Sequence, residues 1–130
     1  MSIQVAWDSE DYTVLRYIFY GWWSWQNLDD AISIAEPMIR SVPHPVHVLI
    51  DLRESCDVPN LDTMEDPRTM SMAPGTSSYL ILTGEIWMTR KFYELSKRLY
   101  RSRRPRNLVA YSEVIDQARD IIGKVLRQTA

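Results

Sequence analysis

The chain has 130 residues, of which 45% are apolar and 25% are charged, so it can bury a core and is not intrinsically disordered. Its length fits one domain, since domains commonly span about 100–150 residues. The net charge of −2 and the pI near 5.6 exclude an overall basic, nucleic-acid-binding composition.

The cysteine content and the start of the chain bear on location. Cys56 is the single cysteine, which excludes an intrachain disulfide and favours a reducing, cytoplasmic setting. The start, Met-Ser-Ile-Gln-Val-Ala-Trp-Asp, has no basic segment before an apolar run, so we expect no secretory signal. No stretch approaches the ~20 apolar residues of a transmembrane helix, and we therefore expect none.

The first predicted elements are two strands. Ile3, Val5 and Trp7 alternate with polar or small residues, as in a half-buried strand. An acidic turn follows, and residues 12–20 are rich in β-branched and aromatic side chains, which predicts a longer strand ending before Gly21. The tight turn predicts that the first strand is antiparallel to the rest of the sheet.

A helix is predicted next, with Ser24 as its N-cap. Pro37 removes a backbone donor, so we expect a kink or an early end there. The apolar positions recur at helical spacing and comprise Leu28, Ala31, Ile32, Ala35, Met38, Ile39 and Val42.

The middle of the chain holds two apolar strands. Residues 46–52 are almost continuously apolar, as in a strand covered on both faces. A weak apolar stripe predicts a short, imperfect helix at 61–72, and residues 79–83 form the next buried strand.

The last third predicts a helix, a strand and a helix. The first helix follows Gly84, is amphipathic and ends at Pro105; the strand covers 107–111; and Ser112 caps the final helix. The apolar faces of these two helices carry Met88, Phe92, Leu95 and Leu99, and then Val114, Ala118, Ile121, Ile122 and Val125.

The order ββαβαβαβα predicts an α/β fold with one mixed, mostly parallel five-stranded sheet flanked by helices, in a single domain spanning 1–130. If the second strand lies between the third and the fourth, the chain reverses direction at that point. Ligands in open α/β sheets bind beyond the carboxyl ends of strands at such a switch point. The candidate residues there are Gly21, Trp22, Thr83 and Gly84, with Asp51, Arg53 and Ser55 alongside.

Three segments resemble the SpoIIAA-like group of small bacterial proteins. They are Trp7-Asp, the Gly-Trp-Trp-Ser-Trp25 start of the first helix and the Val-Leu-Ile-Asp-Leu-Arg53 strand end. That group is related to STAS domains (sulfate transporter and anti-sigma factor antagonist) and is distantly similar to CRAL-TRIO lipid-binding domains. The resemblance implies a regulatory or binding role, with an apolar or lipid-like ligand or a protein as partner.

The anti-sigma antagonists carry a phosphorylatable serine in an Asp-Ser-Ser-Gly-like motif after the third strand. The corresponding segment here begins Asp51-Leu-Arg-Glu-Ser-Cys and has neither an Asp-Ser pair nor a following glycine. Ser55 is the serine on which such a switch would depend.

Three tryptophans follow the second strand. Trp22, Trp23 and Trp25 either complete the core or contact a ligand or partner, and adjacent residues cannot all face inward. Metal binding is not expected, because His47 and Asp51 lie roughly 13 Å apart on a strand with a rise of ~3.3 Å per residue. No nucleophile–base pair or phosphate loop is recognisable, so no cofactor is expected.

Positive charge is concentrated late in the chain. Residues 1–66 hold twelve acidic residues and three arginines, whereas residues 67–130 hold twelve basic and five acidic residues. This stretch is either a solvated helix face or an anion or partner site; nucleic acid is not expected. Its candidate residues are Arg98, Arg101, Arg103, Arg104 and Arg106.

The leading hypothesis from sequence is a non-enzymatic binding or regulatory module for a small apolar ligand or a protein partner. The alternatives are an enzyme for small organic substrates that uses Asp51, Arg53 or Ser55, and a homodimer formed through the tryptophans or the first strand. An enzyme requires an ionisable group with a perturbed pKa inside a cleft.

Overall fold

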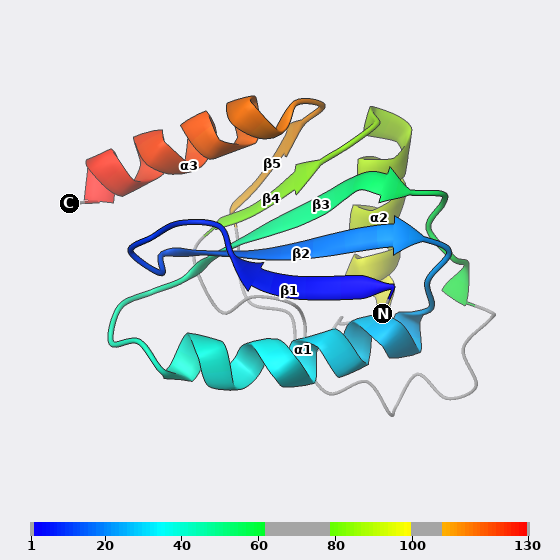
Figure 1. The fold of residues 1–130 in the computed structure, drawn as a ribbon. Helices are drawn as coiled ribbons and strands as arrows, with labels where there is room; N and C mark the ends of the chain where they lie inside the picture. Colours follow the sequence, from blue (N-terminus) through cyan, green and yellow to red (C-terminus); the bar gives the residue numbers. More distant parts are fainter. Residues whose placement is uncertain (1, 62–78, 100–107, 130) are drawn as a thin grey trace.

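The computed structural model describes residues 2–61, 79–99 and 108–129 (Figure 1). Five strands and three helices follow one another along this part of the chain. They are β1 (Ile3–Trp7), β2 (Val14–Gly21), α1 (Trp25–Arg40), β3 (His47–Ser55), β4 (Tyr79–Thr83), α2 (Ile86–Leu99), β5 (Leu108–Ser112) and α3 (Ile115–Thr129). Residues 62–72 of the predicted short helix lie outside the described residues.

The five strands form one mixed sheet in the order β1-β2-β3-β4-β5. β1 is antiparallel to β2, as predicted, and the β2–β3, β3–β4 and β4–β5 pairings are parallel. The predicted α/β class with one five-stranded sheet and flanking helices is therefore confirmed.

The predicted placement of the second strand is wrong. β2 lies between β1 and β3 rather than between β3 and β4, so the chain does not reverse direction there. The reason is that β1 pairs with one edge of β2, which leaves only its other edge for β3. The α1 and α2 crossovers, which follow β2 and β4, also pack on the same face of the sheet. Right-handed crossovers on one face add each new strand on the same side.

The larger apolar core lies between the sheet and the α1–α2 layer. Alternate strand residues point to opposite faces, so Leu15, Tyr17 and Phe19 of β2 face this layer. Trp25 and Leu28 of α1 pack against them, and all five side chains are buried.

A smaller apolar cluster joins α3 to the opposite face, above the sheet in Figure 1. Its buried members are Val14, Leu49, Ile81, Ala118 and Ile122, one from each of β2, β3 and β4 and two from α3. The two clusters place α3 alone on its side of the sheet, among the described helices.

Local signals explain where α1 begins and ends. The Ser24 hydroxyl accepts a hydrogen bond from the Asn27 amide at 3.0 Å, and the Asn27 side chain accepts one from the Ser24 amide at 2.9 Å. This capping box satisfies two donors that the first turn leaves open. Of the kink or early end predicted at Pro37, the helix does not end at that residue, since Pro37 lies in the last turn and the helix continues to Arg40.

Several boundaries also shifted by a few residues. β2 begins at Val14 because Tyr12 adopts a positive φ of 58° in the preceding turn. β3 extends beyond residue 52 to Ser55, and α3 begins at Ile115, three residues after Ser112. Within the described residues, no helix has the length and apolar character to cross a membrane.

Candidate binding site at the carboxyl edge of the sheet

The carboxyl ends of β2, β3, β4 and β5 lie along one edge of the sheet, because these strands are parallel. The register pairs Gly21 with Ser55 and Asp51 with Thr83. β3 therefore separates the predicted site residues into two groups. Gly21 and Trp22 lie on its β2 side and Thr83 and Gly84 lie on its β4 side, while Ser55 belongs to β3 itself.

The three tryptophans divide between core and surface. Trp25 is 1% exposed and Trp23 is 6% exposed, and their ring centroids lie 5.1 Å apart in an edge-on arrangement. Both rings also contact Phe92 of α2. Trp22, in contrast, is 76% exposed. Trp23 and Trp25 therefore belong to the core, and Trp22 alone of the three is open to a ligand or partner.

Ser55 is engaged in structural hydrogen bonds. Its Oγ accepts a bond from Trp23 Nε1 at 2.9 Å and donates one to the Asp57 carbonyl at 2.9 Å. The hydroxyl thus links the buried Trp23 to the loop after β3. A nucleophilic or phosphorylated serine at this position would first have to give up both bonds.

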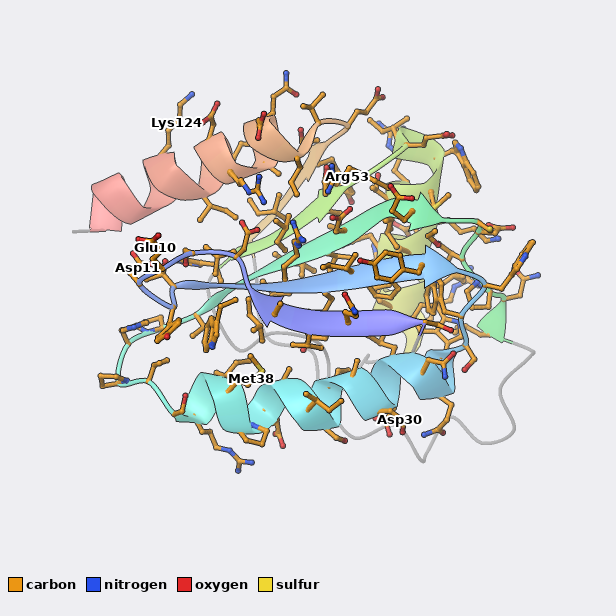
Figure 2. All side chains as sticks on the ribbon, viewed as in Figure 1. Glu10, Asp11, Asp30, Met38, Arg53 and Lys124 are labelled. Carbon is orange, nitrogen blue, oxygen red and sulfur yellow. The ribbon has the colours of Figure 1, made fainter. Side chains whose placement is uncertain are left out.

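Asp51 and the partly exposed Arg53 form a bidentate pair on the α3 side of the sheet, where Figure 2 labels Arg53. Arg53 Nε donates to Asp51 Oδ1 at 2.9 Å and Nη2 donates to Oδ2 at 2.8 Å. The carboxylate is only 2% exposed, and the hydrogen bonds to it raise the pKa of Arg53. Asp51 is thus fully occupied by its neighbour.

A crevice of about 190 Å³ lies beside this pair. It is lined by Leu52, Arg53, Ser55, Gly84, Glu85, Met88 and Glu113. Three predicted site residues, Arg53, Ser55 and Gly84, therefore meet in one place. The crevice is smaller than the roughly 300–1,000 Å³ typical of small-molecule sites.

Thr83 and Gly84 have mainly structural surroundings. Thr83 is fully buried, and among the described residues its Oγ1 has no hydrogen-bond partner. Gly84 adopts a φ of 142°, and a Cβ there would come within 3.2 Å of the Leu52 backbone. Only glycine permits this close approach of the β4 end to β3.

Sequence reasoning missed two exposed apolar residues at the same edge and placed a third, Val114, on the apolar face of the last helix, although it is 48% exposed. Ile86 and Trp87 begin α2 beyond β4, Val114 follows β5, and Trp87 is 49% exposed. The sequence contained a signal for them, because each is an apolar residue just after a predicted strand end. Ile86 and Trp87 lie outside the predicted apolar helix face, and Val114 lies at the start of the next one. Together with Trp22 they form what we call the carboxyl-edge surface.

Three acidic residues lie close in sequence to this surface, and one of them, Glu85, accepts a hydrogen bond from Trp87 Nε1. Glu54, Glu85 and Glu113 are exposed, and none of them forms an ion pair with a described residue. Lys91 instead pairs with Asp57 at 3.1 Å, tying α2 to the loop after β3. The backbone amide of Val58 and then Lys91 lower the pKa of Asp57.

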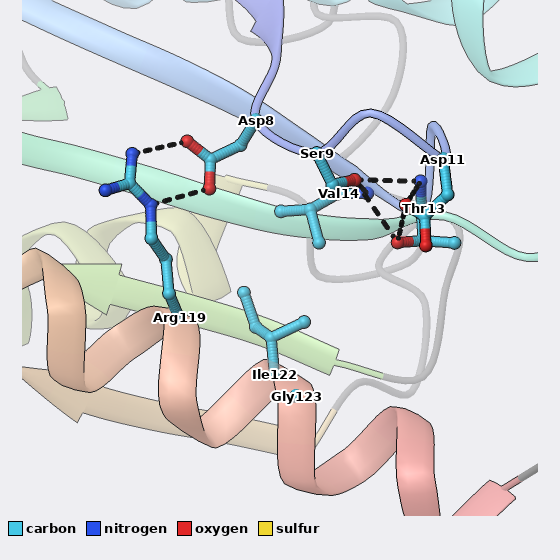
Figure 3. Close-up of a pocket in the computed structure, with 8 residues that line it drawn as sticks. All are labelled: Asp8, Ser9, Asp11, Thr13, Val14, Arg119, Ile122 and Gly123. Atoms are coloured by element: carbon cyan, nitrogen blue, oxygen red, sulfur yellow. Dashed lines mark hydrogen bonds and ion pairs between the residues drawn. The ribbon is translucent and has the colours of Figure 1, made fainter.

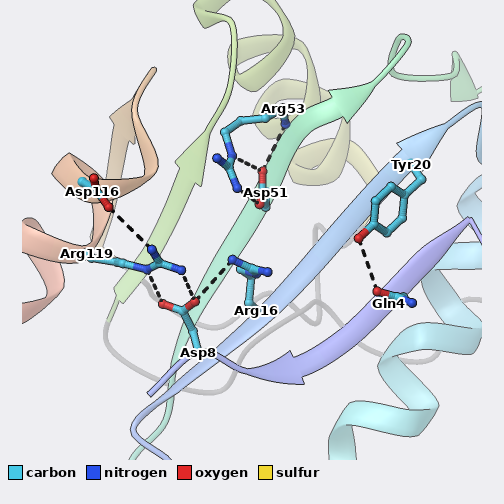
Figure 4. A network of polar contacts seen from close by, with 8 residues as sticks. All are labelled: Gln4, Asp8, Arg16, Tyr20, Asp51, Arg53, Asp116 and Arg119. Carbon is cyan, nitrogen blue, oxygen red and sulfur yellow. Dashed lines mark hydrogen bonds and ion pairs between the residues drawn. The ribbon is translucent and has the colours of Figure 1, made fainter. Parts of the chain in front are cut away.

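A second polar network lies on the α3 side of the sheet (Figure 4). Asp8, whose side chain is 7% exposed, receives Arg119 from α3 and Arg16 from β2, the latter at 3.4 Å. On β1 and β2, Tyr20 donates to Gln4 at 3.3 Å. A pocket of about 240 Å³ opens between Asp8, the β1–β2 turn and α3 (Figure 3).

Of the predicted basic residues, Arg98 is exposed in the last turn of α2, and Arg101, Arg103, Arg104 and Arg106 lie outside the described residues. No group of three metal-ligating side chains comes together in the described part of the chain.

Comparison of the chain with protein-family models, with curated proteins and with solved structures gave no significant match.

Proposed function

We propose that this chain is a non-enzymatic binding module whose carboxyl-edge surface binds a protein partner. The observation that carries the proposal is the exposure of Trp22, whose neighbours Trp23 and Trp25 are buried. Ile86, Trp87 and Val114 extend the apolar surface along the ends of the neighbouring strands.

Exposed tryptophans are suited to this role. Tryptophan is enriched among the residues that dominate protein–protein binding, because its large ring fills pockets with little loss of side-chain freedom. Burying an aromatic side chain of ~200 Å² that is as exposed as Trp22 would contribute about 4 kcal/mol at ~25 cal/mol per Å². A partner that also covers Trp87 would gain less from that second ring, because Trp87 is only 49% exposed.

Charge specifies the kind of partner. Glu54, Glu85 and Glu113, at the ends of β3, β4 and β5, add exposed negative charge to this edge, where Arg53 is the partly exposed cation among them. A partner segment with aliphatic or aromatic side chains and flanking lysines or arginines would complement both features.

The geometry supports a protein partner over the small apolar ligand. The Trp23–Trp25–Phe92 cluster fills the interior behind the edge. The adjoining crevice of about 190 Å³ is lined in part by Arg53, Glu85 and Glu113, which do not suit an acyl chain.

The alternative of an enzyme has less support. The Asp51 carboxylate accepts hydrogen bonds from Arg53 on both oxygens. The Ser55 hydroxyl is hydrogen-bonded to the Trp23 side chain and to the Asp57 carbonyl. A general base or nucleophile needs a free lone pair or an adjacent base. A member of the SpoIIAA-like group, as the tryptophan-rich start of α1 suggests, would fit a regulatory binding role in the cytoplasm.

A selection from a random peptide library displayed on phage tests the proposal. We expect the wild-type chain to enrich peptides that combine basic and large apolar residues. The double variant Trp22→Ala/Trp87→Ala should lose at least tenfold in affinity for them, which is about 1.4 kcal/mol. Glu113→Lys should weaken the same peptides through charge.

Tyr12→Ala is the matched control, because Tyr12 is also an exposed aromatic residue but lies in the β1–β2 turn. Its peptide affinity should equal that of the wild type. Peptides that bind the double variant as tightly as the wild type would disprove the role of this surface. A retained small molecule seen by native mass spectrometry would instead favour the ligand-binding alternative.

A further inference from the structure

One face of the sheet is covered only in part. α1 and α2 pack on one face, whereas α3 packs on the other face against β3, β4 and β5. No described helix covers β1 on the α3 side, where Gln4, Ala6 and the neighbouring Tyr20 of β2 are exposed. Strands that pair in parallel, as β2 and β3 do, are usually covered on both faces. The uncovered part of this face is therefore a candidate binding surface.

Three arginines gather on this surface, and Figure 4 shows them on β2, β3 and α3. Arg16 Nη1 and Arg119 Nη2 contact the same oxygen of Asp8, at 3.4 and 2.8 Å. Hydrogen bonding to Asp51 raises the pKa of Arg53, and the positive charge of Arg119 opposes this effect. The three guanidinium groups therefore lie within electrostatic reach of one another.

The carboxylates of this network are buried, whereas the guanidinium groups reach solvent. The side chains of Asp8 and Asp51 are 7% and 2% exposed. Those of Arg16, Arg53 and Arg119 are 23%, 38% and 43% exposed. A ligand that approaches this face therefore meets hydrogen-bond donors, although the buried carboxylates offset most of the formal charge.

Some of these donors have no acceptor. Arg53 uses Nε and Nη2 for Asp51, and no described residue accepts a hydrogen bond from its Nη1. Arg16 makes one contact with the described part of the chain, the long one from Nη1 to Asp8, which leaves Nε and Nη2 open. Because the buried carboxylates already hold both guanidinium groups in place, a ligand would lose little affinity to side-chain ordering.

We propose that this surface binds a phosphate group, held between Arg16 and Arg53 on the uncovered face of the sheet beside α3. The open donors come from two neighbouring strands, and the oxygens of a phosphate accept hydrogen bonds from several directions. A carboxylate, in contrast, is planar and is satisfied by a single bidentate arginine. The arrangement therefore favours a phosphate over a carboxylate.

Neighbouring acidic residues define the position of the phosphate more closely. Glu54 follows Arg53 and is exposed, so negative charge disfavours an anion beyond the carboxyl end of β3. Asp116 is 85% exposed and contacts Arg119 Nη1 at 3.6 Å. Arg119 therefore contributes positive charge, while Arg16 and Arg53 donate the hydrogen bonds. The site uses neither Trp22 nor Trp87, so it does not depend on partner binding at the carboxyl-edge surface.

An NMR titration of the isotope-labelled wild-type chain tests the proposal without any mutation. With sodium phosphate at constant ionic strength, the side-chain Nε–H signals of Arg16 and Arg53 should shift along one saturating curve. The signal of Arg40 should not move, because Arg40 lies on α1 and pairs with Glu36 there. Sodium acetate should bind at least fivefold more weakly than phosphate, and sodium chloride should produce no saturating shift.

A second titration with glycerol phosphate distinguishes the sources of the phosphate group. Tighter binding of glycerol phosphate than of inorganic phosphate would support a phosphate carried by an organic ligand. Equal binding of the two would support recognition of the phosphate group alone.

Matched variants assign the site to the arginines. Arg16→Gln should weaken phosphate binding about tenfold, because it removes hydrogen bonds to a charged group. The variant should stay folded, since Asp8 keeps both hydrogen bonds from Arg119, and denaturant unfolding checks this. Arg40→Gln and Trp22→Ala should bind phosphate as the wild type does.

Three results would overturn the proposal. They are the absence of a saturating shift at Arg16 and Arg53 in the wild type, equal binding of acetate and phosphate, and an equal loss of affinity in Arg16→Gln and Arg40→Gln.

Discussion

Arg119 donates two hydrogen bonds to the carboxylate of Asp8, although the two residues are 111 positions apart in the sequence. Nε donates to Oδ2 at 3.0 Å and Nη2 donates to Oδ1 at 2.8 Å. The contact fastens α3 to the turn between β1 and β2, at the border of the small apolar cluster that holds this helix (Figure 3).

Arg119→Ala should therefore loosen α3. We expect the free energy of unfolding to fall by about 1 kcal/mol, because Arg119 is partly exposed while Asp8 retains only the longer contact with Arg16. Denaturant unfolding measures the change. Asp116→Ala, which removes only an exposed contact of the same guanidinium, should stay within about 0.5 kcal/mol of the wild type.

Arg53→Ala should destabilise the chain more than Arg119→Ala. It leaves the Asp51 carboxylate, 2% exposed, without its bidentate partner, and we expect a loss of about 2 kcal/mol after allowing for the partial exposure of Arg53. Arg53→Lys should recover only part of this stability. An ammonium group cannot donate two parallel hydrogen bonds to the two carboxylate oxygens as the planar guanidinium does. Equal stability of Arg53→Ala and the wild type would show that Asp51 finds other partners.

The tryptophans should differ sharply in their contribution to stability. Trp25→Ala empties a site in the aromatic core and removes the hydrogen bond from Nε1 to the Pro59 carbonyl, so we expect a loss of about 3–5 kcal/mol. Trp22→Ala should change the free energy of unfolding by less than about 0.5 kcal/mol. Thermal unfolding of the two variants side by side measures the contrast.

His47 should make stability fall in mildly acidic solution. Burial lowers the pKa of His47 below its ordinary 6.5. Between the folded pKa and 6.5, His47 is therefore protonated in the unfolded chain but neutral in the folded chain. The stabilisation is complete above pH 6.5 and declines as the pH falls from there towards the folded pKa, by up to about 1.4 kcal/mol per pH unit. Denaturant unfolding from pH 7.5 to 5 measures this slope.

His47→Leu should flatten the curve in this window. The lowered pKa of Asp57 affects stability in a different pH range. Its contribution to the free energy of unfolding is present above the ordinary carboxyl pKa near 3.8 and is lost only as the pH falls below that value. A slope that persists between pH 6.5 and 5 in His47→Leu would assign the effect to another group.

The periodicity of the sequence determined the order and type of most elements. Alternation in β1, continuous apolar runs in β3 and β4, and the helical stripes of α1 and α2 are local patterns, since each depends on which face of one element is buried. Boundaries were less certain where a backbone conformation decided them, as at Tyr12, whose positive φ delays the start of β2.

Tertiary structure alone decided the strand order and hence the site. A local pattern does not say which strands pair, and the pairing of β1 with one edge of β2 left only the other edge for β3. Tertiary packing also buried Trp23 and Trp25, left Trp22 outside, and joined Asp51 to Arg53. The sequence by itself determined that this chain builds a sheet covered by helices. Which of its aromatic and charged side chains reach solvent depended on contacts between residues far apart in the chain, because burial is a property of the assembled layers.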